Sequence, residues 1–278
     1  MWLAGIVLLA LFAPLLTLDP RAQDLGSALL PPLSSFNHLL GTDALGRDVL
    51  SLTLHGLRVS LLVGITSSLI GALIGIPLGL LAGYSGGLLE RLVMRAVDVG
   101  LSLPGMLVAL VALALWGAGT DKLIVVLGLT SWAGFARLAR AGALSQRHLE
   151  HVLAAQALGA GMRLIIMRHV LPGIAGTLIV KFTLEIPANM LSEAALSFLG
   201  LGAGVDTPSL GLSIALGYGR LYSGQWWLSI LPGAALTLLV LSVNTCSEHL
   251  RIHLDPRQKH APRDGYTNSG KFLKNFLP

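Results

Sequence analysis

Several apolar runs in this chain are long enough to cross a lipid bilayer, and this feature restricts its fold more than any other. A helix of about 20 apolar residues spans the roughly 30 Å of hydrocarbon in a bilayer. Six runs are predicted as membrane spans, at residues 1–18, 61–81, 97–116, 122–135, 173–201 and 227–246. Only 12% of residues are charged, about half the share in soluble domains, and 54% are hydrophobic. The sequence therefore predicts an all-α membrane protein with six spans.

The first of these runs has an alternative interpretation as a cleaved signal peptide. A signal peptide has a basic start and a small-residue cleavage site after its apolar part. No Lys or Arg precedes this apolar run, and no such site lies cleanly before Asp19. A first membrane span at residues 1–18 is therefore preferred.

Basic residues are distributed unevenly between the two sides of the membrane in this topology. With both ends of the chain in the cytoplasm, thirteen of the nineteen Lys and Arg residues lie in cytoplasmic segments. They are Arg91, Arg95, Arg137, Arg140, Arg147, Arg163, Arg168, Arg251, Arg257, Lys259, Arg263, Lys271 and Lys274. Because cytoplasmic loops of membrane proteins are enriched in Lys and Arg, this orientation is favoured.

Motifs for nucleotide binding and for zinc-dependent hydrolysis are absent from the sequence. It contains no G-x-x-x-x-G-K-[ST] phosphate loop and no H-E-x-x-H. The single cysteine, Cys246, excludes a disulfide framework and a cysteine-based zinc site. His148 and His151 could share a metal on one helical turn, but a solvated helix face is the preferred interpretation. We therefore predict a transport subunit without enzymatic activity, cofactor, metal site or nucleic-acid partner.

The stretch 150–172, EHVLAAQALGAGMRLIIMRHVLP, lies between two apolar regions yet carries acidic, basic and histidine residues. Its alanines and leucines favour a helix, and Gly159 then interrupts the pattern. A second apolar and basic run, residues 162–170, is expected to end before Pro172. The pattern predicts a helix, a glycine turn and a short helix. Its small alanines would let a water-soluble partner approach closely.

This stretch resembles the Glu-Ala-Ala coupling loop of ABC importer permeases. Ala154 and Ala155 hold the two alanine positions, Gly159 the glycine, and Leu171 and Pro172 the end of the motif. Two positions depart from the pattern, where Leu153 stands for the glutamate and His169 for the isoleucine. The resemblance implies that residues 148–172 form a cytoplasmic loop that contacts an ATPase.

Three further strings resemble the dipeptide, oligopeptide and nickel branch of these permeases. One is a GTDxxGRD turn, made of Gly41, Thr42, Asp43, Gly46, Arg47 and Asp48. The others are DVGLSLPG, from Asp98, and SEAALSFLGLG, which contains Glu193. The turn is expected to be an ion-paired loop that stabilises the fold, with direct contact to substrate as the alternative.

The resemblance implies a six-span type I permease bundle in the bacterial inner membrane. Such a subunit pairs with a second, similar permease, two ABC ATPases and an external substrate-binding protein. It would move substrate by ATP-driven alternating access. The alternatives are a transporter or channel not driven by ATP and a membrane-embedded enzyme. Peptides, nickel and metal complexes all remain possible substrates.

Charged residues inside the predicted spans are candidates for special roles, because charge at membrane depth is costly. Lys181 and Glu185 are four residues apart and are expected to pair near the cytoplasmic end of their span. Glu193 is a candidate for the translocation path, with the satisfaction of nearby helix ends as the alternative. Asp98 is expected to be an interfacial or packing residue.

The predicted division of the chain follows from these motifs. Residues 1–18 are the first span, and 19–57 are a periplasmic segment with the GTDxxGRD turn. Residues 58–257 form a five-span permease core, and 258–278 form a polar tail. Ser67, Gly71, Gly75, Gly79 and Gly83 recur every four residues, which predicts a groove where another helix packs closely.

Overall fold

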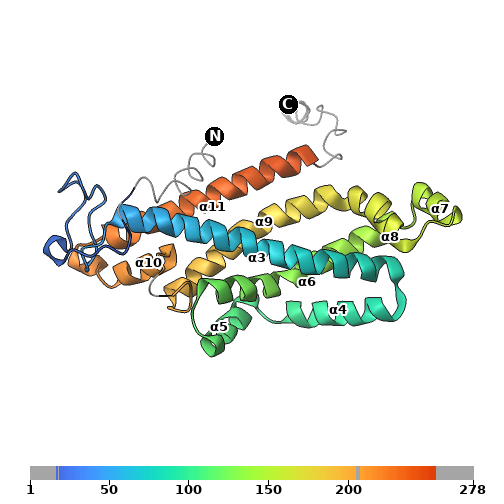
Figure 1. The fold of residues 1–278 in the computed structure, drawn as a ribbon, viewed down its shortest axis with the longest axis horizontal. Helices are drawn as coiled ribbons and strands as arrows, with labels where there is room; N and C mark the ends of the chain where they lie inside the picture. The colour runs from blue at the N-terminus through green and yellow to red at the C-terminus, as the bar shows by residue number, and fades with distance from the viewer. Residues whose placement is uncertain (1–16, 18, 205–206, 255–278) are drawn as a thin grey trace, which may run out of the picture.

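The computed structural model describes residues 17, 19–204 and 207–254, and within these ranges it is helical, with two isolated β-bridges and no strand. The α-helices are α3 (Val49–Ser85), α4 (Gly87–Ser102), α5 (Gly105–Trp116), α6 (Thr120–Gln146), α7 (Glu150–Ala157), α8 (Met162–Ile165), α9 (Leu171–Phe198), α10 (Leu210–Tyr218) and α11 (Trp227–Leu254). Two short 3-10 turns, η1 (Leu25–Ser27) and η3 (Leu221–Ser223), and a π-helical turn, η2 (Ile166–Val170), complete the described elements. The long helices lie side by side in an elongated bundle, which confirms the predicted all-α class (Figure 1).

The closest packing in the bundle is between α3 and α6, along the predicted glycine groove. A Cβ atom added at Gly83 would lie 2.6 Å from the Arg140 carbonyl oxygen, and one at Gly71 would lie 2.9 Å from the Ser131 Cβ. Cβ atoms added at Gly75 and Gly79 would lie even closer to α6, against the carbonyl oxygens of Trp132 and Ala136. The absence of side chains at these positions lets two long helices touch along several turns. The glycine periodicity therefore predicted a real packing surface, and its partner is α6 of the same chain.

Three predicted helix boundaries differ in the structure. The second span begins earlier than residue 61, because the Asp48 carboxylate accepts the Ser51 amide hydrogen and so caps α3. The fourth extends beyond residue 135 to the end of α6, so Arg137 and Arg140, predicted in a cytoplasmic segment, lie within this candidate span and pair with Asp98 and Glu90 of α4. The third span is broken into α4 and α5, which meet at an angle of 84°. Pro104 lacks an amide hydrogen and disfavours helical geometry at Leu103, where α4 ends.

The described residues contain four helices long and apolar enough to cross a membrane, or five if α4 and α5 are counted as one span. The predicted first span, residues 1–18, lies outside the described residues apart from Thr17. The predicted polar tail, residues 258–278, also lies outside them.

Two different structures occupy the ends of the bundle (Figure 1). The segment that leads into α3, helix α10 and the start of α11 gather at one end, and α7 and α8 project from the other. The turn between α3 and α4, at Gly86, lies at the α7 end. The two predicted functional loops, GTDxxGRD and 148–172, therefore lie at opposite ends of the molecule.

Candidate functional site

Helix α7 is fixed to the bundle by one buried side chain on an otherwise exposed helix. Val152 is fully buried and packs in a cluster with Ile165 and Ile166 of the following segment and with Leu80 of α3. The Gln156 side chain donates a hydrogen bond of 2.9 Å to the Tyr84 hydroxyl, at the end of α3. The Arg147 guanidinium reaches the Gly83 carbonyl oxygen, at 3.2 Å. These contacts fix the loop 148–172 in place against α3.

Gly159 ends α7 in a conformation that favours glycine. Its φ angle is +79°, and a Cβ atom added there would have no neighbour within 4 Å. The Ala160 amide donates to the Ala155 carbonyl at 3.0 Å, and the Gly159 amide to the Gln156 carbonyl at 2.9 Å. This pair of bonds is the Schellman arrangement, which satisfies carbonyls at a helix end. The helix–glycine turn–helix prediction is confirmed, and backbone geometry rather than crowding explains the glycine.

The sequence predicts that the helical run after the turn ends before Pro172, and this prediction is wrong. Helix α8 continues through η2 into α9, so Met162–Phe198 forms one apolar helical stretch. The Leu171 amide donates to the Ile166 carbonyl, five residues earlier, in a widened π-helical turn. Pro172 follows directly after this turn, and its missing amide hydrogen removes one backbone hydrogen bond from the continuous helix. Leu171 and Pro172 therefore mark a change of helical geometry and not a break.

The outer surface of this loop exposes apolar side chains between charged ones such as Glu150 and Arg163. Ala154 is exposed and Ala155 is half-buried. Leu158 is 89% exposed, and Leu153, the departure from the glutamate of the family pattern, is 47% exposed. Leu164 and Met167 extend the exposed apolar surface onto the following segment. Exposed apolar side chains that lie close together on a surface are typical of a protein contact.

The GTDxxGRD turn at the opposite end is held by a dense set of hydrogen bonds. The Asp43 carboxylate accepts from the Leu45 amide at 2.8 Å and from the Arg47 amide at 2.9 Å, and it pairs with the Arg47 guanidinium at 2.7 Å. Thr42 is fully buried, and its hydroxyl accepts from the Leu30 amide at 2.9 Å. Asp48 caps α3 and also lies 3.2 Å from the His38 imidazole.

The two glycines of the turn are required where the chain passes close to itself. Gly41 and Gly46 have φ angles of +81° and +71°. A Cβ atom at Gly41 would lie 3.2 Å from the Pro31 carbonyl carbon, and one at Gly46 would overlap the Asp24 carbonyl. Asp24 caps η1, and hydrogen bonds from the Ser27 hydroxyl and the Gly26 amide lower the pKa of its carboxyl. Every member of the predicted turn thus makes a contact within the chain itself.

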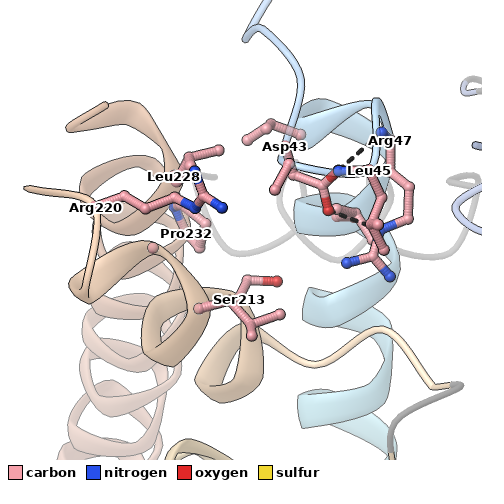
Figure 2. A pocket seen from close by; sticks show the side chains of 12 residues that line it. Asp43, Leu45, Arg47, Ser213, Arg220, Leu228 and Pro232 are labelled. Carbon is pink, nitrogen blue, oxygen red and sulfur yellow. Dashed lines mark hydrogen bonds and ion pairs between the residues drawn. The ribbon is translucent and has the colours of Figure 1, made fainter. Parts of the chain in front are cut away.

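A cavity of about 170 Å³ opens between this turn and helices α10 and α11 (Figure 2). Asp43 and Arg47 lie on one side of it, and Ser213 and Arg220 lie on the other. Apolar side chains such as Leu228 complete the wall. Because Asp43 and Arg47 form an ion pair with each other, this side of the cavity carries no net charge. The Trp227 indole donates to the Thr42 carbonyl at 3.3 Å and links α11 to the turn.

Glu193 lies fully buried between α3, α9 and the segment before α10. Its carboxylate accepts hydrogen bonds from three hydroxyls, Ser60 at 2.7 Å, Ser197 at 2.7 Å and Ser209 at 2.9 Å. The Ser197 and Ser209 hydroxyls converge on one oxygen, and Ser60 binds the other. The carboxylate therefore joins three parts of the bundle and faces no open space.

Two ion pairs lie away from both ends. Lys181 and Glu185 of α9 form the predicted pair, with Lys181 lying 5.5 Å from the centre of the Phe135 ring. Lys181 lies ten residues after the start of α9, and the expected position of the pair near the cytoplasmic end of its span stays a prediction. Asp98 of α4 pairs with Arg137 of α6 at 2.6 Å. Sequence reasoning missed this second pair, since its members are far apart in the chain and only the packing of α4 on α6 brings them together.

The histidines near the coupling loop do not assemble a metal site. The His148 imidazole accepts from the Arg147 guanidinium at 3.1 Å, and the His151 and His169 rings lie 5.9 Å apart. Among the described residues, no group of three potential ligands is close enough to hold a metal ion.

Comparison with known proteins identifies the family. Residues 75–260 match the family described as "Binding-protein-dependent transport system inner membrane component". A dipeptide transport system permease protein of Bacillus subtilis is 38% identical over 235 residues, covering 84% of this chain and 73% of that protein. A di/tripeptide transport system permease protein of Pseudomonas aeruginosa is 39% identical over 261 residues, covering 92% and 86%.

A solved structure supports the same architecture. The methionine ABC transporter MetNI, in an inward-facing conformation, superposes with a TM-score of 0.60 at 22% identity, over 73% of this chain and 96% of that chain. At this identity the likeness shows the fold alone. The chain therefore belongs to the binding-protein-dependent transport system inner membrane component family, and is a multi-pass inner-membrane permease subunit of an ABC importer with the type I permease fold.

Proposed function

We propose that this chain is one of two permease subunits in a peptide importer driven by ATP. A second, similar permease would complete the membrane path, two ABC ATPases would bind on the cytoplasmic side, and an external binding protein would deliver the substrate. Both termini would lie in the cytoplasm. Alternating access would follow from ATP-dependent closure of the ATPases, transmitted to the helices.

The observation that carries this proposal is the coupling loop, an exposed apolar surface on a rigidly anchored support. Val152 and Ile165 tie both arms of the loop into one buried cluster with α3 and α6. Helix continuity over Met162–Phe198 connects the same loop to the centre of the bundle. Movement of a partner bound to α7 would therefore move α9. In this proposal Ala154, Ala155, Gly159, Leu171 and Pro172 form the ATPase-coupling site.

The other predicted site residues take structural roles in the proposal. Gly41, Thr42, Asp43, Gly46, Arg47 and Asp48 would stabilise the periplasmic end, as their mutual contacts support. Glu193, predicted as a translocation-path candidate, would instead join helices through its three hydroxyl partners.

A peptide is the substrate class best supported by the relatives. Their names specify dipeptide, di/tripeptide, glutathione and oligopeptide systems. Nickel remains the other substrate to be tested. A transporter or channel not driven by ATP would have no use for a docking surface of the kind that α7 presents.

The test substitutes the coupling loop and leaves the spans intact. Ala155→Arg and Gly159→Asp should leave normal amounts of protein in the membrane, because neither residue lies within the packed bundle. Peptide uptake should fall close to zero, and the ATPase recovered in a pull-down should decrease. Ala22→Arg, at an exposed alanine near the opposite end, is the matched control and should behave like the natural protein. Normal uptake with both loop variants would show that the loop is an ordinary connector.

A further inference from the structure

Four charged side chains are gathered on one side of α6, at the middle of the bundle. Asp98 and Arg137 pair across α4 and α6, and their side chains are 68% and 54% exposed. Lys181 and Glu185 pair on α9, with side chains 31% and 15% exposed. In a chain with 12% charged residues, such a concentration away from the loops requires an explanation.

Both pairs border the same turn of α6. A Cβ atom added at Gly134 would lie 3.5 Å from the Lys181 ammonium nitrogen, so the Lys181 side chain crosses Gly134. Arg137 is three residues further along α6, which places it on the same side of the helix as Gly134. The Asp98–Arg137 pair, approached from α4, and the Lys181–Glu185 pair, approached from α9, therefore lie on either side of a position that has no side chain.

Both pairs lie within helical stretches that are long and apolar enough to cross a membrane. Arg137 belongs to Thr120–Gln146, and Lys181 and Glu185 belong to Met162–Phe198. Charged residues within membrane spans face a bundle interior or a water-filled cavity, because exposure to lipid is costly. The Asp98 and Arg137 side chains are more than half exposed in this chain, so the α4–α6–α9 side faces water or another subunit and not lipid.

We propose that Asp98, Arg137, Lys181 and Glu185 form a contact site for a zwitterionic peptide on its way through the membrane. The proposal rests on the peptide-importer function given above and names the residues that meet the substrate. The peptide carboxylate pairs with Arg137 or Lys181, and its ammonium group pairs with Asp98 or Glu185. Gly134 leaves room for the peptide backbone between the two pairs.

The balance of charge selects this class of substrate. The site holds two cations and two anions, so a zwitterion exchanges partners with it and leaves no charge unpaired. A divalent metal ion would instead meet an arginine and a lysine and only carboxylates that are already paired. Partly exposed ion pairs contribute little stability, so a peptide can open the Asp98–Arg137 pair at small cost.

The experiment uses the complete importer, with its second permease, ATPases and binding protein, reconstituted in proteoliposomes. Uptake of labelled alanyl-alanine is measured together with the ATPase activity that the loaded binding protein stimulates. We expect Asp98→Asn and Arg137→Gln each to lower uptake about tenfold, while stimulated ATPase activity stays within about twofold, because delivery and coupling do not involve these side chains. The exchanged pair, Asp98→Arg with Arg137→Asp, should recover most of the uptake.

The chain offers a matched control in a second ion pair between α4 and α6. The Arg140 guanidinium contacts the Glu90 carboxylate at 2.7 Å, about one turn of α6 further from Gly134 than Arg137. Glu90→Gln should leave uptake unchanged. Should Asp98→Asn and Arg137→Gln transport at the natural rate, or should uptake and ATPase activity fall together with no recovery in the exchanged pair, the contact site is refuted. Absence of peptide uptake by the natural importer, or uptake of nickel in its place, would instead refute the proposed function.

Discussion

The side chains at the two ends of this permease differ in where they find their contacts. At the GTDxxGRD end, each polar side chain of the turn finds its partner within the chain, as the Asp43–Arg47 pair and the Asp48 cap show. At the α7 end, the backbone is capped, but apolar side chains of the loop stay uncovered, and Leu158 is 89% exposed. The segment before the GTDxxGRD turn also exposes apolar side chains, such as Phe36 at 99%. The difference between the ends therefore lies in the motif residues, which make internal contacts at one end and leave apolar surface open to water at the other.

This difference shows what each of the two motifs means in physical terms. The glycines of the GTDxxGRD turn are needed because neighbouring backbone lies against them, so the motif maintains a shape. Gly159 has open space around it. Its role is therefore to turn the chain from α7 toward α8 and to fix the angle between these helices. The first end should respond to mutation by unfolding, and the second by losing a partner.

The largest expected contrast between the ends is their accessibility. In a chain whose exposed Cys246 has been replaced by Ser, Ser145→Cys, close to Arg147, should react with a membrane-impermeant maleimide only after the cells are opened. A cysteine near Arg257, outside the described residues, should behave alike. Asn37→Cys, at the opposite end, should react in intact cells. The physical basis is the excess of Lys and Arg on the α7 side. Labelling of residue 145 in intact cells would reverse the proposed orientation.

A second contrast is in stability. Gly46→Ala should destabilise the protein by about 3 kcal/mol or more, because its Cβ would overlap the Asp24 carbonyl while the backbone remains in a left-handed conformation. The melting temperature in detergent and the amount of protein in the membrane should both fall. Gly26→Ala, in the same segment but at an ordinary φ, is the control, since its Cβ would meet only the Asp24 side chain, at 3.2 Å. Equal melting temperatures for the two variants would contradict the shape-maintaining role.

Much of the fold could be predicted from local patterns. Hydropathy located the helices, the glycine spacing located the α3–α6 contact, and Gly159 located the turn. Prolines were less informative, because Pro77, Pro187 and Pro232 lie inside helices while Pro104 separates two helices at 84°. What distinguishes them is the tertiary packing around each one, and a single sequence does not contain it.

The site residues show the same limit. The Asp43–Arg47 and Lys181–Glu185 pairs are four residues apart, so helical or turn geometry suggests them directly. Asp98 and Arg137 are brought together only when α4 packs on α6. Glu193 gave a clear signal as a charge within an apolar run, but its serine partners come from distant positions. Sequence located the charge and only the structure located the hydroxyls.

The smallest expected effect is at Gly159, and it sharpens the comparison of the two ends most directly. Gly159→Ala adds a methyl group that meets nothing within 4 Å, so its only cost is the left-handed backbone conformation, about 1 kcal/mol. The melting temperature should therefore fall much less than in Gly46→Ala. Gly161→Ala is the matched control, because Gly161 also has open space but has a φ of −69°, which alanine adopts readily. Gly161→Ala should therefore leave the melting temperature unchanged. ATPase recovery in the pull-down should fall in Gly159→Ala and stay unchanged in Gly161→Ala, because only the former makes the left-handed turn between α7 and α8 less favourable. A melting temperature as low as that of Gly46→Ala would show that the coupling end, like the opposite end, is held together by its turn.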